Sequence, residues 1–134
     1  MLMDSQDKNK NEWSRLINSF GFALNGLKNA IMKERNLQIH ISVAVLVVIL
    51  GAFFQLSYSD WALLVIVIGG MFTLELVNTS IERLVDLVTM EFHPLAKLAK
   101  DISAAAVFVF SLTAVVVGFL IFYPYMLEWF MGNF

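Results

Sequence analysis

The chain has 134 residues, of which 59% are hydrophobic and only 15% charged, and its mean hydropathy is +0.74. Soluble domains carry about 25% charged residues, so this balance predicts one all-α domain, residues 1–134, embedded in a membrane. A net charge of −2 argues against nucleic acid as a partner, because binding phosphates requires a basic face. The absence of cysteine excludes disulfides and thiolate metal sites.

Residues 12–35 have the periodicity of an amphipathic helix. Large apolar side chains recur in this segment every three or four positions: Trp13, Leu16, Ile17, Phe20, Leu24, Leu27 and Ile31. Arg15 and Lys28 occupy other faces. In a soluble protein such a helix would face the core. Beside membrane spans, we expect it to lie along the cytoplasmic interface.

Three apolar runs follow, and they predict transmembrane helices over about 37–57, 61–87 and 102–123. The first and third are free of Asp, Glu, Lys and Arg and approach the roughly 20 residues that a spanning helix needs. The second run has only fourteen residues before Glu75. These would cover about 21 Å of a hydrocarbon core of about 30 Å, so the helix must continue past Glu75. This places the Glu75 carboxylate inside the membrane or just beneath its interface.

The basic residues predict the orientation of the chain. Six precede the first span and three separate the second from the third: Lys8, Lys10, Arg15, Lys28, Lys33 and Arg35, then Arg83, Lys97 and Lys100. By the positive-inside rule, the N-terminus and the 83–101 connection are cytoplasmic and the C-terminus is external, as in a multi-pass protein of a bacterial inner (cytoplasmic) membrane. Tyr123, Tyr125 and Trp129 then suit an external aromatic belt.

The segment ELVNTSIERLVD carries a polar stripe. Glu75, Asn78, Glu82 and Asp86 are separated by three, four and four residues and therefore share one helix face. Pairing with nearby basic residues would explain Asp86 equally well. That explanation is weak for Glu75, because a carboxylate at membrane depth is costly and is usually functional.

The stripe suits phosphoryl transfer to a lipid alcohol. Glu75 can take a proton from a headgroup hydroxyl as a general base. Glu82 and Glu34 can hold magnesium, which favours one or two carboxylates together with phosphate oxygens. Lys100, beside Asp101 at the start of the third span, offers a cation to offset phosphate charge.

The same segment resembles the signature of the small prokaryotic diacylglycerol kinases, roughly E-x-x-N-[ST]-[SA]-[IV]-E-x-x-V-D, at every fixed position. The resemblance runs from about Arg15 to Tyr123. ERNLQIH (34–40) and EFHPLAKLAKD (91–101) look more like the branch that includes undecaprenol kinases. The resemblance implies an ATP- and magnesium-dependent lipid kinase that forms a homotrimer with shared active sites. The enterobacterial form has a tyrosine where Phe22 stands here, so a hydroxyl contact is lost.

Roles for individual residues also follow from the resemblance. Glu75 matches the family's catalytic base, and Glu34 and Glu82 match the metal-binding carboxylates that bracket ATP. Asn78 would position the reacting groups, and Asp86 would support the site. The remaining nucleotide-contacting positions are Arg15, Glu91, Phe92, His93, Lys100 and Asp101.

Two other functions compete with the kinase. A small proton-coupled transporter can use one membrane carboxylate such as Glu75 as its proton relay, although the acidic residues outside the spans argue against it. An inactive assembly subunit is the third interpretation. Among kinase substrates, undecaprenol and diacylglycerol both bury their tails in the bilayer, so the apolar spans leave the choice between them open.

Overall fold

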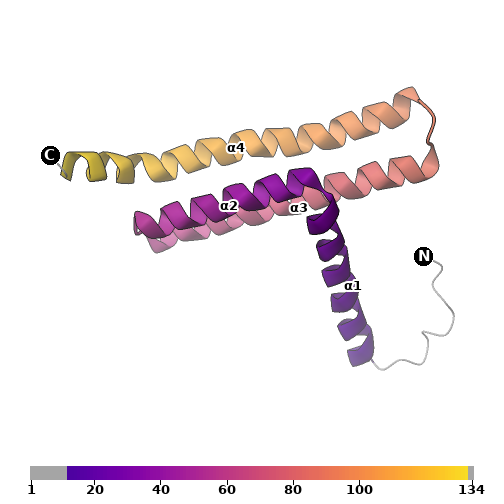
Figure 1. Cartoon of the computed structure of the whole chain (residues 1–134), viewed down its shortest axis with the longest axis horizontal. Coiled ribbons are helices and arrows are strands. Elements are labelled where there is room, and N and C mark those ends of the chain that lie inside the picture. The colour runs from indigo at the N-terminus through magenta and orange to yellow at the C-terminus, as the bar shows by residue number, and fades with distance from the viewer. Residues whose placement is uncertain (1–11, 133–134) are drawn as a thin grey trace. The chain divides into compact units, whose positions relative to one another are not determined.

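The computed structural model describes residues 12–132, and within that range the regular structure is entirely helical (Figure 1). Its elements are α1 (Glu12–Lys33), α2 (Arg35–Phe53), α3 (Tyr58–Val88) and α4 (Pro94–Gly132). Helix α1 belongs to one compact unit and the chain from Glu34 onward to a second, and each is described by itself. Lys8 and Lys10, counted above among the cytoplasmic cations, lie outside the described residues. The all-α prediction is confirmed, and α2, α3 and α4 are long and apolar enough to cross a membrane.

Helix α1 is the amphipathic segment expected from the sequence. Its apolar stripe is exposed, with the side chains of Trp13 and Phe20 largely uncovered. Arg15 lies on this helix, and its carbonyl oxygen accepts a hydrogen bond from Ser19 Oγ at 2.9 Å. An exposed apolar stripe of this kind is what a helix on a membrane interface presents to lipid.

Helices α2 and α3 are joined by a tight reversal of the chain. Helix α2 ends at Phe53, short of the expected residue 57, because Gln55 adopts a left-handed conformation (φ 53°). The backbone N–H of Leu56 donates back to the Gly51 carbonyl at 3.1 Å. Ser57 then caps α3, its Oγ accepting from the N–H of Asp60 at 3.2 Å.

Helix α3 is the central element of the second unit, because it packs against both α2 and α4 (Figure 1). Close approach to α4 depends on Gly70, where an added Cβ would lie 2.5 Å from the ring of Phe110. Helix α4 begins at Pro94 and continues through Pro124, so it is longer than the apolar run that predicted it. Residues 94–101, which include Lys97, Lys100 and Asp101, extend the helix at its start, and residues 124–132 extend it at its end.

A polar cluster ties the C-terminal part of α4 to the start of α3. Tyr125 Oη donates to Asp60 Oδ2 at 2.6 Å and accepts from the Ser57 N–H at 3.0 Å. Ser57 Oγ donates to the same carboxylate oxygen at 2.7 Å. Beside this cluster lies a small apolar core of Leu56, Leu64 and Ile121. These bonds fix the spacing of α3 and α4 at the end of the bundle opposite the α3–α4 loop.

Replacing Tyr125 with phenylalanine should destabilise this end of the bundle. Tyr125→Phe keeps the ring but leaves Asp60 and the Ser57 N–H without the hydroxyl, so the unfolding midpoint should fall. Thermal unfolding of the purified protein in detergent would measure it. Tyr123→Phe, at a half-exposed tyrosine on the same helix, is the matched control. Equal shifts of the two unfolding midpoints would contradict a stabilising role for this cluster.

Candidate active site

Glu75 lies within α3 and is only 2% exposed. The uninterrupted helix Tyr58–Val88 confirms that α3 continues past it. Its Oε2 has no hydrogen-bond partner among the described residues. From α2, Asn36 comes within hydrogen-bonding reach of the carboxylate and His40 is near enough to act on its charge. A buried polar atom left unpaired costs free energy, and this one calls for a functional explanation.

Asn78 connects the stripe to α4. Its Nδ2 donates to Glu82 Oε1 at 2.9 Å, one turn further along α3. Its Oδ1 accepts from Ser103 Oγ of α4 at 2.7 Å. Because both ends of the buried amide are engaged, the orientation of Asn78 is fixed, and with it one oxygen of Glu82.

Glu34 precedes the first residue of α2 and reaches toward α3. Its side chain makes no capping bond to the helix. Instead its Oε1 accepts from Arg83 Nη2 at 2.6 Å. Glu34 and Glu82 both lie near enough to Glu75 to act on the charge of its carboxylate. The structure thus brings Glu34, which is far from the other two in sequence, near the predicted base Glu75 and the second predicted metal ligand, Glu82.

Asp86 and Lys100 form an ion pair between α3 and α4, with Asp86 Oδ1 2.5 Å from Lys100 Nζ. Asp86 therefore pairs with a nearby basic residue, which is the alternative to a functional role that the sequence analysis gave for it. Asp101 pairs with Lys97 one turn away on α4. All four side chains are well exposed, and exposed pairs are worth at most about 1 kcal/mol.

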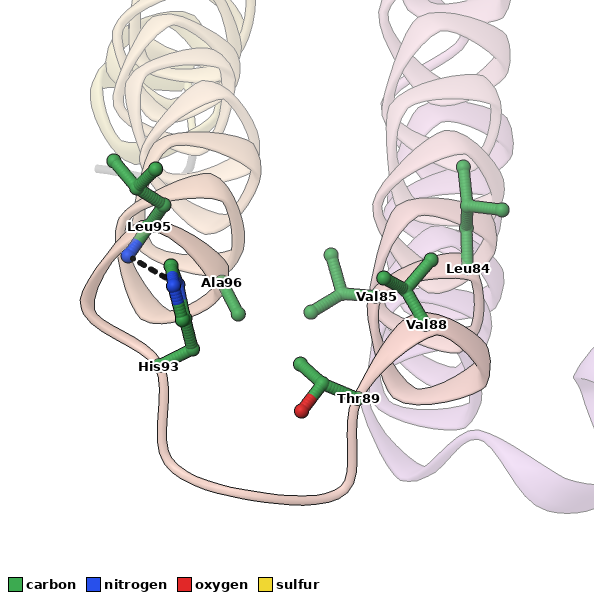
Figure 2. A pocket seen from close by; sticks show the side chains of 7 residues that line it. All are labelled: Leu84, Val85, Val88, Thr89, His93, Leu95 and Ala96. Atoms are coloured by element: carbon green, nitrogen blue, oxygen red, sulfur yellow. Dashed lines mark hydrogen bonds between the residues drawn. The ribbon is translucent and has the colours of Figure 1, made fainter.

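Glu91, Phe92 and His93 lie in the loop between α3 and α4 (Figure 2). The His93 Nδ1 accepts from the N–H of Leu95 at 3.3 Å, and its carbonyl oxygen accepts from the N–H of Lys97 at 3.0 Å. His93 therefore caps the start of α4. Figure 2 shows its imidazole beside a shallow apolar pocket, whose lining comes from both sides of the loop: Leu84, Val85, Val88, Thr89, Leu95 and Ala96. Phe92 is exposed in the loop.

Arg15 and Phe22 lie on α1, in the other unit, so their expected roles stay predictions.

The sequence analysis missed four residues near the stripe: Asn36, His40, Arg83 and Ser103. Asn36 and His40 carried a usable signal, because polar residues four apart at the start of an apolar span share one helix face. Arg83 figured only among the basic residues that predict the orientation of the chain, and Ser103 was not singled out. Their contacts cross between helices and are set by tertiary packing.

Comparison with known proteins identifies the family. Residues 21–122 match the family model for prokaryotic diacylglycerol kinase. The chain belongs to the prokaryotic diacylglycerol kinase family. The match includes every predicted site residue except Arg15, and it confirms the resemblance seen in ELVNTSIERLVD.

The individual relatives are named either undecaprenol kinase or diacylglycerol kinase. The chain is 47% identical to the undecaprenol kinase of Bacillus subtilis, over 91% of this chain and 98% of that protein. It is 36% identical to the diacylglycerol kinase of Synechocystis sp., over 89% of this chain and 70% of that protein. Identity to the diacylglycerol kinase of Escherichia coli K12 is 27%, over 81% of this chain and 88% of that protein.

Proposed function

We propose that this chain is a lipid kinase that transfers the γ-phosphoryl group of ATP to the hydroxyl of undecaprenol at the cytoplasmic membrane interface. The observation that carries the proposal is the buried Glu75 carboxylate, whose Oε2 has no hydrogen-bond partner among the described residues, near Glu34 and Glu82 in a chain of this family. Family membership supports lipid kinase activity, with undecaprenol or diacylglycerol as the acceptor. It gives no support to the proton-coupled transporter.

In the proposed reaction, Glu75 acts as the general base. The lipid hydroxyl oxygen forms a bond to the γ-phosphorus as the bond from that phosphorus to the β–γ bridging oxygen breaks and ADP leaves with its electron pair. The hydroxyl proton goes to Glu75, whose Oε2 is free to accept it. Asn78 supports the transfer by holding Glu82 in one orientation.

Magnesium is the metal that this site fits, provided that it arrives with the nucleotide. Among residues 12–132, no three His, Cys, Asp or Glu side chains are grouped closely enough to hold a metal by themselves. Magnesium needs only one or two carboxylates when phosphate oxygens and water complete its shell, and Glu34 and Glu82 supply two. The ion pair of Glu34 with a guanidinium indicates that this carboxylate favours a cation. Bound there, magnesium would offset charge on the phosphates.

The remaining predicted residues would hold the nucleotide on the cytoplasmic side. Lys100 can exchange Asp86 for a phosphate, and Asp101 stands next to it. The proposed contacts from α1 and from the loop are Arg15, Glu91, Phe92 and His93. The distribution of basic residues supports a cytoplasmic N-terminus and an external C-terminus in a bacterial inner membrane. A homotrimer with shared sites would help to shield these polar groups from lipid.

The sequence identities to named relatives favour undecaprenol over diacylglycerol as the acceptor. The undecaprenol kinase of B. subtilis matches this chain at 47% identity over nearly its whole length. The diacylglycerol kinases of Synechocystis sp. and E. coli K12 match at 36% and 27%. Diacylglycerol, the substrate named for these more distant relatives, is the second candidate.

Direct phosphorylation assays test the proposal. Purified protein in mixed micelles, given labelled ATP and magnesium, should transfer label to undecaprenol faster than to diacylglycerol. Faster labelling of diacylglycerol would overturn the choice of lipid, and labelling of neither would overturn the kinase. In membrane vesicles, added ATP should support the reaction only when the cytoplasmic face is outward. Reaction in vesicles of the opposite orientation would contradict the proposed topology.

Removing either metal-binding carboxylate should raise the magnesium requirement. Glu34→Gln and Glu82→Gln keep side-chain size but remove the charge that attracts the ion, so the magnesium concentration for half-maximal rate should rise about tenfold or more. Magnesium titrations of the kinase rate give this value. Glu128→Gln, at an exposed glutamate near the other end of α4, is the matched control. Unchanged magnesium dependence in either test variant would exclude that carboxylate as a ligand.

A further inference from the structure

Arg83 is a residue of the site that the family signature leaves unspecified. It follows Glu82 directly in α3, at the first variable position of E-x-x-V-D. Its Nη2 donates to Glu34 Oε1 at 2.6 Å and so joins α3 to the start of α2. Arg83 is therefore the chain neighbour of one proposed metal ligand, Glu82, and its guanidinium contacts the other, Glu34.

Helix geometry places Arg83 at the edge of the polar stripe. Successive residues of an α-helix are about 100° apart, so Glu75, Asn78 and Glu82 share a face and Arg83 lies to one side of it. Asn78 contacts α4 through Ser103, whereas Arg83 contacts the start of α2. Asn78 thus presents a neutral amide that contacts Glu82 and α4, and Arg83 presents a guanidinium that contacts Glu34 at the start of α2.

The negative charge of the acidic residues explains why the Arg83 guanidinium lies at this site. Glu34 and Glu82 lie near enough to Glu75 to act on the charge of its carboxylate, and Arg83 offsets the negative charge of Glu34. If magnesium binds Glu34, the guanidinium must give up the oxygen that it now occupies. The pair is partly exposed, with 50% of the Arg83 side chain and 27% of the Glu34 side chain accessible. Breaking such an exposed pair costs little free energy.

We propose that Arg83 is a nucleotide-binding residue that pairs with Glu34 before nucleotide binds and would donate to a phosphate oxygen once Glu34 holds the magnesium of the bound nucleotide. Guanidinium groups bind phosphate well because their planar donors match two oxygens at once. The move exchanges one anionic partner for another, so the arginine stays paired in both states. This inference rests on the proposed function, because it requires a magnesium nucleotide at Glu34 and Glu82.

A purely structural role makes a different prediction. If Arg83 only held α2 against α3, its loss would lower the stability of the protein and weaken the binding of metal and nucleotide together. If it competes with the metal and then binds phosphate, its loss should affect metal and nucleotide in opposite directions.

Binding measurements on Arg83→Gln separate the two roles without requiring turnover. Manganese, a paramagnetic substitute for magnesium, can be titrated into the detergent-solubilised protein and followed by electron paramagnetic resonance. The β,γ-imido analogue of ATP, which is not cleaved, can be titrated at saturating metal. In Arg83→Gln, manganese alone should bind a few-fold more tightly than in the wild type, because the competing guanidinium is gone. The analogue should bind about tenfold to a hundredfold more weakly, as expected for one charged hydrogen-bonding contact.

Two further variants sharpen the comparison. Arg83→Lys keeps the charge but not the paired donors, so its affinity for the analogue should fall between those of wild type and Arg83→Gln. Lys28→Gln removes one exposed cation from α1 and should bind both ligands as the wild type does.

Loss of affinity for manganese and analogue together, with a lower unfolding temperature, would overturn the proposal in favour of a brace. Unchanged affinity for the analogue in Arg83→Gln would overturn it as well. In both cases lipid phosphorylation by the wild type would leave the proposed function intact. Failure of the wild type to phosphorylate any lipid would instead overturn the proposed function, and the manganese titration alone would still show whether Arg83 competes for Glu34.

Discussion

A carboxylate placed on an apolar helix is expensive, and the structure around Glu75 follows from the need to accommodate it. Without a hydrogen-bonding or charged environment, an ionised group at this depth would lose its hydration and gain little in return. Helix α3 meets this constraint by packing between α2 and α4, which brings Asn36 and His40 close to one side of the carboxylate. One oxygen still lacks a partner among the described residues, and that oxygen is where a substrate proton can go.

The two ends of the α3–α4 pair have different properties. At one end, Tyr125, Asp60 and Ser57 form a closed set of hydrogen bonds beside a small apolar core. At the other end, the exposed ion pair of Asp86 with Lys100 connects the helices. Hydrogen bonds that share one carboxylate suit a fixed spacing, whereas an exposed ion pair is weak. The proposed exchange of Lys100 from Asp86 to a nucleotide phosphate would therefore take place at the weakly held end.

The sequence predicted the helices and the polar stripe because both depend on local periodicity. Continuation of α3 past Glu75 followed from the thickness of the membrane, and ELVNTSIERLVD identified the family. The ends of α2 and α4 differed from the expected spans, because hydropathy reports contact with lipid, whereas helices end where capping and backbone conformation end them.

Partners across helices could not be predicted in this way. Glu34 was expected as a metal ligand, but its contact with Arg83 depends on how α2 docks on α3. The hydrogen bond of Ser103 to Asn78 depends likewise on the packing of α4. His93 was expected to contact nucleotide, and in the structure its side chain also caps the start of α4.

The kinetic effect of Glu75→Gln tests the central claim, that this buried carboxylate is the base, most directly. The substitution keeps the shape of the side chain and removes its ability to take a proton. General-base catalysis contributes about 10²–10⁴-fold, so kcat for lipid phosphorylation should fall within that range. Nucleotide affinity and the unfolding temperature should stay close to those of the wild type, since neither depends chiefly on proton transfer. A Glu75→Gln protein that is folded and phosphorylates lipid at the wild-type rate would contradict the account.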